Sequence, residues 1–325
     1  MSIGKALVTG GAGFIGSHVV RALLDAGAEV RVLDNFSTGA RENLEGLDVE
    51  VRVGDIRDAE ACGRACEGVD VAFHLAAYIS VPGSVADPVL ADSINVTGAM
   101  NVLLAARDRG ARRLVFSSSA AVYGDTPIVP TPEDTLPKPL SPYGLEKLYG
   151  EHLARLFFEL YGLETVCLRY FNVYGPRQNP RSEYAAVIPK FIERLLAGQT
   201  PTIYGDGGQT RDFLFVEDVA RANLLAAEAQ GVAGEVFNVA GGSALSVNEL
   251  AEALARAVGS SRAAEHGPAR AGDIRHSCAD TSKARRRLGF EPRFGLADGL
   301  ARTVAFVRSQ MGDGSGSTGT GGTSR

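Results

Sequence analysis

The sequence predicts an α/β fold, with a doubly wound parallel Rossmann sheet and a smaller α/β substrate-binding domain. Short apolar runs alternate with longer amphipathic ones through the first half of the chain. A glycine-rich loop, TGGAGFIGSH, directly follows the first of these runs. After about Gly175 Pro, Gly and Arg become frequent, and helical patterns are interrupted by loops. With 325 residues, the chain has room for two domains of ~100–200 residues each.

Seven apolar runs rich in Val, Leu and Ile are the expected strands of the sheet. They are Lys5–Thr9, Glu29–Leu33, Val49–Val53, Val71–Leu75, Arg113–Ser117, Thr165–Arg169 and, later in the chain, Glu235–Ala240. Helical patterns lie between them, among them Phe14–Ala26, Asp87–Arg109 and Tyr143–Tyr161. Near-continuous apolar strands that alternate with helices indicate a parallel sheet covered on both faces.

The late run Glu235–Ala240 is expected to return to the main sheet, so the two domains interleave. We expect residues 1–175 and a returning segment at about 212–242 to form the Rossmann domain. Residues 176–211 and 243–310 are then the substrate domain. Residues 311–325 are rich in Gly, Ser and Thr, a composition that cannot build a core, and they are expected to be a flexible tail.

Composition excludes several classes of partner. The net charge of −5 provides no basic footprint for nucleic acid. The chain starts with a strand running into the glycine loop, so we expect neither a signal peptide nor a membrane span, and a cytoplasmic location. The four cysteines, Cys62, Cys66, Cys167 and Cys278, have no disulfide or zinc spacing and are expected to be buried thiols, and no metal site is predicted.

Gly10, Gly13 and Gly16 lie between the first strand and the first helix. A tight turn and a close backbone approach exclude a β-carbon there, and the helix N-terminus then faces a pyrophosphate. A glycine triplet alone is also found in ordinary turns. Here the strand, the spacing, the helix and an acidic residue coincide, which predicts a dinucleotide site.

The acidic residue is Asp34, at the end of the second strand. A carboxylate at this place accepts both ribose hydroxyls and repels a 2′-phosphate, which favours NAD over NADP. Arg41 is near enough in sequence to leave NADP open. Asp55 and Ile56 are expected to frame the adenine, and Asn95 is either a cofactor contact or a core amide. The full expected cofactor set is Gly10, Gly13, Phe14, Ile15, Gly16, Asp34, Asn35, Ser37, Gly39, Asp55, Ile56, Leu75, Ala76, Ala77, Asn95, Ser117, Tyr143, Lys147 and Tyr170.

Tyr143 and Lys147 lie one turn apart in SPYGLEKL, so both project from one helix face. Three serines, Ser117, Ser118 and Ser119, end the fifth strand at the edge where ligands bind. A tyrosine pKa near 10 is too high for a base at neutral pH. A nearby ammonium and a positively charged nicotinamide both favour the phenolate, which can then take a carbinol proton. Ser119 is the expected hydrogen-bond partner of the same substrate oxygen.

Together these residues resemble the extended short-chain dehydrogenase/reductase family, specifically the UDP-hexose 4-epimerases. The resemblance runs through TGGAGFIGSH, DNFSTG, HLAA, SSSAAVYG and the Tyr143–Lys147 pair. It continues through LRYFNVYGPRQNP, YAAVIPKFI, YGDGGQTRDFLFVEDVA and RAGDIRHSCAD. The later motifs are specific to enzymes of nucleotide sugars.

The resemblance implies a UDP-sugar site. Its expected residues are Ser118, Ser119, Asn172, Ala186, Val187, Thr202, Tyr204, Arg211, Arg270, Asp273 and Ser277. Asn172 would contact the diphosphate or sugar, Arg211 and Arg270 would clamp the diphosphate, and Asp273 would bind the uridine ribose. Cations in Gly-rich loops suit a phosphate-bearing substrate; the alternative for each arginine is a surface ion pair with Asp212 or Asp273.

The family's reaction moves the C4 hydride to bound NAD⁺ and back to the other face of a 4-keto sugar. Sugar 4,6-dehydratases and UDP-glucuronate decarboxylases carry an acidic residue after the strand-five hydroxyl, where this chain has Ala120 and Ala121. Simple reductases and a catalytically silent NAD sensor are further alternatives. The complete Tyr–Lys–Ser trio disfavours the sensor.

Ser277 aligns with the family's gate residue, and its small size predicts that N-acetylated sugars are accepted beside plain ones. UDP-glucuronate is the alternative substrate, with Arg177 or Arg181 facing its carboxylate. Asn172 and Asn179 differ from what that subgroup leads us to expect. By resemblance we also expect a homodimer through the helices Asp87–Arg109 and Tyr143–Tyr161.

Overall fold

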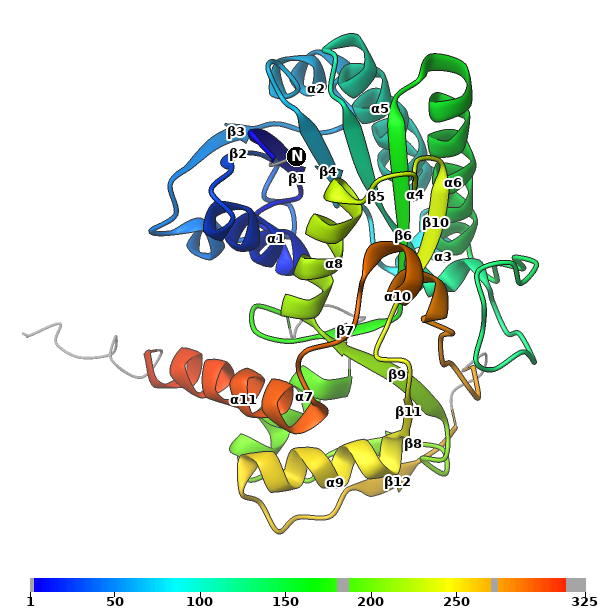
Figure 1. Cartoon of the computed structure of the whole chain (residues 1–325). Helices are drawn as coiled ribbons and strands as arrows, with labels where there is room; N and C mark the ends of the chain where they lie inside the picture. Colours follow the sequence, from blue (N-terminus) through cyan, green and yellow to red (C-terminus); the bar gives the residue numbers. More distant parts are fainter. Residues whose placement is uncertain (1–2, 180–186, 270–273, 314–325) are drawn as a thin grey trace, which may run out of the picture.

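Seven parallel strands form the central sheet of the larger part of the molecule, at the top of Figure 1. The computed structural model describes residues 3–179, 187–269 and 274–313. The strands stand in the order β3-β2-β1-β4-β5-β6-β10. Their bounds are Lys5–Thr9 for β1, Glu29–Asp34 for β2, Val49–Val53 for β3, Val71–His74 for β4, Arg113–Ser119 for β5, Glu164–Tyr170 for β6 and Glu235–Val239 for β10. The predicted Rossmann-type α/β fold is confirmed.

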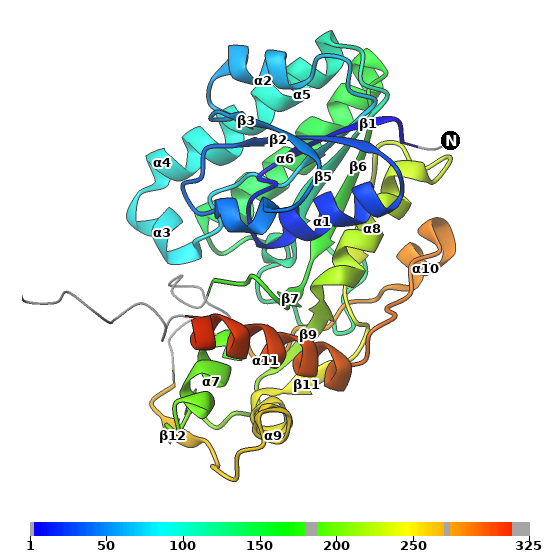
Figure 2. The same cartoon turned by 90° about the vertical axis from the view of Figure 1, so that its left-hand side faces the viewer.

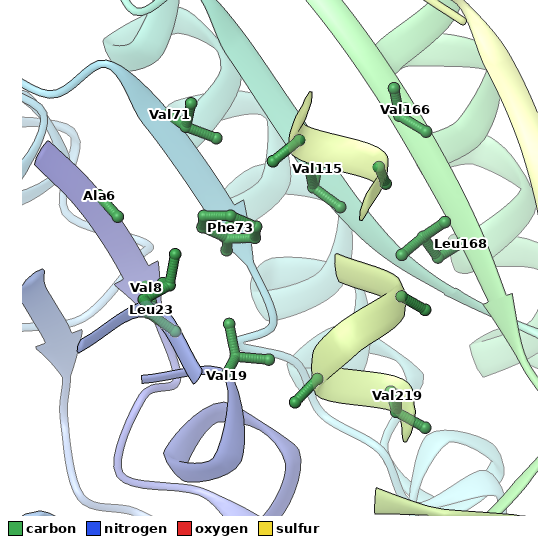
Figure 3. Packing of buried hydrophobic residues seen from close by; sticks show 14 of the residues in the cluster. Ala6, Val8, Val19, Leu23, Val71, Phe73, Val115, Val166, Leu168 and Val219 are labelled. Carbon is green, nitrogen blue, oxygen red and sulfur yellow. The ribbon is translucent and has the colours of Figure 1, made fainter. Parts of the chain in front are cut away.

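Helices cover both faces of this sheet. One face carries α1 (Phe14–Asp25) and α8 (Val216–Glu228), and the other carries α2 (Ala59–Ala65), α5 (Gly98–Asp108) and α6 (Pro142–Tyr161). Alternate side chains of a strand point to opposite faces. In β1, Ala6 and Val8 therefore pack in the core toward α1 and α8, and Leu7 in the core on the other face. Figure 3 shows the first of these two cores.

The catalytic candidate helix α6 has well-defined ends. Ser141 caps its start by accepting a hydrogen bond from the Gly144 amide at 3.1 Å, and Pro142 occupies the first turn. Gly162 ends it in the left-handed region at φ 74°, a conformation that glycine adopts readily. The helix predicted at Tyr143–Tyr161 thus begins one residue earlier.

The helix predicted at Asp87–Arg109 is divided. It comprises α4 (Pro88–Asp92), a π-helical turn η2 (Ser93–Thr97) and α5, and a short helix α3 (Val81–Ala86) precedes it. The stretch Pro88–Asp108 is long and apolar enough to cross a bilayer. Its residues Ala91, Ala99, Val102, Leu103 and Ala106 are buried in the protein, so one face of the stretch packs in the core.

The smaller part, at the bottom of Figure 1, has its own apolar core. Strands β7 (Asn172–Tyr174), β9 (Thr210–Phe215) and β11 (Ala244–Ser246) form a three-stranded sheet, and β8 (Thr202–Tyr204) pairs with β12 (Glu265–Gly267). Helices α7 (Val187–Leu196), α9 (Val247–Val258) and α11 (Leu296–Asp313) pack together beside them (Figure 2).

The two parts interleave more than the sequence indicated. Strand β10 pairs with β6 in the main sheet, where the run Glu235–Ala240 was expected to return. A second return was not expected: α10 (Ser282–Leu288) packs on β10 and α8, and Ala284, Leu288 and Phe290 join the main core. Conversely, β7 and β9 lie in the smaller sheet, although residues 172–175 and 212–215 were assigned to the Rossmann domain. Residues 314–325 of the expected tail lie outside the described residues.

Candidate active site

The candidate site lies at the carboxyl ends of the central strands, facing the smaller part. The strand order reverses between β1 and β4, and ligands of open α/β sheets bind at such a switch point. The loops after β1, β2, β4 and β5 carry most of the residues predicted from sequence. The fold therefore brings the cofactor candidates and the catalytic candidates to one edge.

The glycine loop between β1 and α1 has no room for side chains. Gly10 has φ +70°, and a Cβ there would lie 2.7 Å from the Ala76 nitrogen. A Cβ on Gly16 would lie 2.1 Å from the Gly10 oxygen. The loop is thus a tight cradle of backbone at the start of α1, and a helix N-terminus attracts a pyrophosphate.

Asp34 fits the predicted ribose contact. It is buried at the end of β2, where Oδ2 accepts a hydrogen bond from the Ala12 amide at 2.9 Å and Oδ1 from the Phe36 amide at 2.8 Å. Each carboxylate oxygen can accept two hydrogen bonds. One position on each oxygen therefore remains for the two hydroxyls of a ribose.

The loop 35–40 closes over the glycine loop. The Ala40 amide and the Asn43 side chain both donate to the Ala12 carbonyl, and a Cβ on Gly39 would lie 2.9 Å from the Ala12 carbonyl carbon. The Arg41 guanidinium lies over the Phe36 ring, 4.2 Å from its centroid. Asn35 accepts a hydrogen bond from the Ser37 amide.

Asp55, which was expected to bind the adenine amine, has its carboxylate hydrogen-bonded to neighbouring residues of the protein. Asp55 Oδ1 accepts hydrogen bonds from the Arg57 backbone amide and from Arg57 Nε. Asp55 Oδ2 accepts hydrogen bonds from Arg57 Nη2 and from the side-chain Nδ2 of Asn35. These four contacts fill the carboxylate's acceptor positions, and Arg57 holds its pKa well below the usual range. Ile56, which was expected to pack on the adenine, is buried between β3 and α2.

The predicted catalytic trio comes together. Lys147 is buried, and its Nζ donates to the Ser117 carbonyl at 2.8 Å. The same nitrogen lies 5.8 Å from the centroid of the Tyr143 ring. The Ser119 side chain lies close enough to the Tyr143 hydroxyl to act on its pKa, and Ser119 Oγ accepts a hydrogen bond from the Ala121 amide at 3.1 Å.

Burial shifts both titrating groups of this trio toward their neutral forms. It raises the pKa of Tyr143 to about 12, against the opposing effect of the Ser119 side chain. It lowers the pKa of Lys147 to about 8, while Glu146 and Glu151 act to raise it. At neutral pH Lys147 therefore carries a charge and Tyr143 is a neutral phenol that needs further positive charge to ionise.

The side chains of the three serines of β5 point alternately to opposite faces of the sheet. Ser117 and Ser119 face the site, whereas Ser118 is buried on the other side of the strand and its hydroxyl donates to Glu151 Oε1 at 2.5 Å. The prediction that the Ser118 side chain contacts substrate therefore does not fit the structure. Glu151 in turn forms a buried ion pair with Arg169.

The other cofactor candidates lie at the same edge of the sheet or are buried and hydrogen-bonded within the protein. Leu75, Ala76 and Ala77 follow β4 at the same edge and are half-buried. Asn95 is buried, and both hydrogens of its amide are used by protein acceptors, which matches the core-amide alternative. Tyr170 is buried in the main core, where its hydroxyl donates to Asn223 Oδ1 at 3.0 Å.

The smaller part contributes the substrate candidates. Asn172 donates to the Asp212 carbonyl, and the Ser277 amide donates to the Thr210 carbonyl, so both lie beside Arg211 on β9. Val187 begins α7, and Thr202 and Tyr204 lie on β8. Ala186, Arg270, Asp273 and the alternative residue Arg181 lie outside the described residues.

Asp212 has a role that the sequence did not reveal. It was considered as an ion-pair partner of Arg211, but its carboxylate is fully buried and accepts hydrogen bonds from the amides of Gly241, Gly242 and Ala279. Burial raises its pKa to about 6. Asp212 thereby ties β9 to the segment that carries Ser277.

Comparison with known proteins agrees with this geometry. The model of the NAD dependent epimerase/dehydratase family matches residues 6–240. The UDP-glucose 4-epimerase of Mycolicibacterium smegmatis is 44% identical over 312 residues, which cover 94% of this chain and 99% of the relative.

Two solved structures are also similar over nearly the whole chain. A UDP-N-acetylglucosamine 4-epimerase from Methanobrevibacter ruminantium, in complex with UDP-N-acetylmuramic acid, is 41% identical with a TM-score of 0.91 and covers 96% of this chain and 100% of its own. The UDP-glucose 4-epimerase of Thermus thermophilus, in complex with NAD, is 40% identical with a TM-score of 0.86 and covers 94% and 99%.

The fold and the site define an enzyme of the Rossmann type that binds a dinucleotide, with a tyrosine–lysine pair as its candidate catalytic groups. The chain belongs to the NAD dependent epimerase/dehydratase family. Its cofactor is NAD. The glycine cradle and Asp34 are the candidate residues for binding it.

Proposed function

We propose that the protein is a UDP-sugar 4-epimerase, an isomerase that inverts C4 of the sugar through a 4-keto intermediate. The observation that carries this proposal is the trio of Tyr143, Lys147 and Ser119 beside a turn without any carboxylate. Ala120 and Ala121 form that turn, η3 (Ala120–Val122), directly after Ser119. When bound, NAD⁺ would supply a hydride acceptor and a positive charge.

Tyr143 is the proposed base and then acid. It takes the proton of the C4 hydroxyl as the C4–H bond breaks, and it returns that proton when the carbonyl is reduced from its other face. Ser119 shares the hydrogen bond to the same oxygen. Lys147 stabilises the phenolate by its charge, and its bond to the Ser117 carbonyl fixes the ammonium in place.

The neighbouring carboxylates support epimerisation over elimination of water. Elimination needs an acid and a base in addition to the tyrosine, and the family's dehydratases place them after the strand-five hydroxyl. In this chain Glu146, a buried carboxylate on α6, is hydrogen-bonded to Asn95 at 2.6 Å. Glu151 is paired with Arg169. Neither is a free proton donor.

The smaller part is proposed to anchor UDP while the sugar turns. Asn172 and Arg211 lie on neighbouring strands, β7 and β9, and Arg211 is a natural partner for a diphosphate. Arg270, Asp273 and Ala186 remain proposals from the family resemblance. Firm hold on the diphosphate with loose hold on the sugar permits the 4-keto intermediate to present either face.

N-acetylated sugars are proposed substrates beside plain ones. Ser277 is half-buried beside β9, and its small side chain leaves room that an aromatic residue would fill. The alternative substrate, UDP-glucuronate, needs a cation at its carboxylate. Arg177 donates from Nη1 to Ser17 Oγ on α1 at 3.4 Å, and the second candidate cation, Arg181, lies outside the described residues.

A homodimer is proposed through the outer faces of α3, α4 and α6. These helices expose large apolar side chains, which in water favour burial against a second copy. Val89 is 78% exposed and Leu160 66%, and Val85, Leu145, Tyr149 and Leu156 are also exposed. Sedimentation equilibrium tests this proposal: a dimer is expected, and a monomer at micromolar concentration contradicts it.

The activity is tested with three UDP-sugars and no added NAD. The purified protein is incubated separately with UDP-glucose, UDP-N-acetylglucosamine and UDP-glucuronate, and each C4 epimer is quantified by chromatography. Turnover of the first two is expected, and Tyr143→Phe abolishes it while UDP binding is retained. Turnover of UDP-glucuronate alone would overturn the substrate proposal, and an active Tyr143→Phe variant would overturn the proposed base.

A further inference from the structure

A buried carboxylate that the proposed chemistry does not use lies inside the catalytic helix. Glu146 stands on α6 between Tyr143 and Lys147 and is only 6% exposed. Its Oε2 accepts a hydrogen bond from Asn95 Nδ2 at 2.6 Å. Burying a carboxylate raises the free energy of the folded protein unless hydrogen bonds compensate for the lost water. The hydrogen bond from Asn95 provides part of that compensation.

Asn95 connects this carboxylate to the loop that follows β4. The π-helical turn η2 carries Asn95, and such turns are frequent at functional sites. Its Oδ1 accepts from the Tyr78 amide at 2.8 Å, and its Nδ2 also donates to the Tyr78 carbonyl at 3.0 Å. Asn95 therefore holds the loop and α6 together with both amide hydrogens and the amide oxygen.

The same loop has a second connection to the catalytic helix. The Tyr143 amide donates to Ser84 Oγ of α3 at 3.2 Å. Tyr78 and Ser84 bracket the segment that leads from the carboxyl edge of β4 into α3. The position of Tyr143 is thus fixed from that segment at both ends, once directly and once through Asn95 and Glu146.

Glu146 acts on both titrating groups of the site. Its charge works to raise the pKa of Tyr143 and, against burial, the pKa of Lys147. It therefore favours the lysine ammonium and opposes the tyrosine phenolate. Its own pKa is raised by burial, and the Asn95 hydrogen bond acts in the opposite direction.

The other titratable groups around α6, within the described part of the chain, are mostly paired or neutral. Glu151 on α6 pairs with Arg169 of β6, and Asp92 on α4 adds a like charge near Glu146. His74 of β4 is kept neutral by burial, which lowers its pKa to about 3, and it is hydrogen-bonded to Thr9. Burial raises the pKa of Tyr170 and of Cys167 on β6. Arg107 and Asp108 of α5 form an ion pair with each other near Tyr161, at the far end of α6.

We propose that Glu146, held in place by Asn95, is a positioning residue that sets the charge balance between Tyr143 and Lys147. The proposal rests on the proposed function, in which Tyr143 is the base. It also joins that balance to the loop after β4, because the amide that holds Glu146 holds the Tyr78 backbone as well.

The test is a charge deletion that keeps the hydrogen bond. Glu146→Gln retains an acceptor for Asn95 Nδ2 and removes the negative charge. We expect the acid limb of the epimerisation pH profile to move to lower pH, so that the rate at pH 6 relative to the plateau rises about threefold. Glu159→Gln, on the exposed end of the same helix, is the matched control and leaves the profile unchanged.

A swap of the two side chains separates charge from structure. Asn95→Asp places a second carboxylate within hydrogen-bond distance of Glu146. The two then share one proton, so the pair keeps a single negative charge near neutral pH and the acid limb stays near its native position. The double variant Asn95→Asp with Glu146→Gln restores one carboxylate and one amide to the pair, and its profile returns toward that of the native protein. A merely structural role predicts lower melting temperatures in every variant with no ordered movement of the limb, and that result would overturn the proposal.

A second readout is independent of turnover. The chain contains no Trp, so the absorbance change at 295 nm on raising the pH of the NAD-loaded protein reports tyrosinate. The difference from Tyr143→Phe isolates Tyr143, and Glu146→Gln is expected to lower its midpoint. An unchanged midpoint refutes the inference even if the enzyme is active. If no UDP-sugar is turned over but the midpoint moves, only the proposed function fails.

Discussion

Replacing Lys147 by Met removes one charge from the site while nearly preserving side-chain length. The ammonium lies 5.8 Å from the centroid of the Tyr143 ring. At an effective dielectric constant of about 20, two unit charges at that separation interact by about 3 kcal/mol. Loss of this attraction lowers the phenolate population, and with it the rate of hydride removal, by about 100-fold at neutral pH.

The loss of rate in Lys147→Met should become smaller as the pH rises. The variant lacks the charge that favours the phenolate, so the acid limb of its pH profile moves to higher pH. The difference in rate between the variant and the native protein shrinks as rising pH ionises Tyr143 in the variant. In the native protein the lysine pKa of about 8 means that the ammonium is lost as the pH rises above that value. A decline on the alkaline side is therefore expected in the native protein and absent from the variant.

The assay is the first half-reaction, followed as absorbance at 340 nm when a UDP-sugar is mixed with the NAD-loaded protein. Single-turnover rates are measured from pH 6 to 10 for the native protein, Lys147→Met and the control Lys5→Met, which lies at the opposite edge of the sheet. A deficit of the same size at every pH would refute the electrostatic reasoning, as would a variant with the native rate.

Three further predictions concern the cradle, the smaller part and the sugar. Gly16→Ala places a Cβ 2.1 Å from the Gly10 oxygen, so the Kd for NAD measured by calorimetry should rise more than ~10-fold; retained NAD would contradict the cradle. Asp212→Asn turns an amide N–H₂ toward backbone donors and should lower the urea-derived free energy of unfolding by about 2–3 kcal/mol, whereas an unchanged value would show that the carboxylate is not a structural link. Ser277→Tyr should suppress turnover of UDP-N-acetylglucosamine while that of UDP-glucose persists; equal losses for both would exclude a gate at this position.

Much of the main sheet could be predicted because its signals are local. The apolar runs of β1 and β3 and the glycine loop are contiguous in sequence, and their expected bounds match the structure. The trio of Ser119, Tyr143 and Lys147 was also predictable, since a strand end and one helical turn fix the three residues relative to one another. These inferences needed no contact between distant segments.

The remaining features depend on contacts between distant segments. Burial of Ser118 follows from the alternation of β5, but its bond to Glu151 requires α6 to lie behind that strand. The return of α10 to the main core has no periodic signal beyond a short helix, and the π-helical turn at Ser93–Thr97 is invisible in the apolar pattern. The role of Asp212 depends on amides 29 and 67 residues away.

A redox reaction hidden within a net epimerisation requires that the hydrogen on C4 leaves as hydride and returns to the same carbon. The protein is incubated in ordinary water with UDP-glucose carrying deuterium at C4, and the product epimer is examined by NMR and mass spectrometry. Deuterium is expected to be retained at C4 of the product, because the same hydride returns to the sugar. Loss of deuterium to solvent would contradict this expectation, since C4 would then be inverted by proton exchange rather than by hydride transfer.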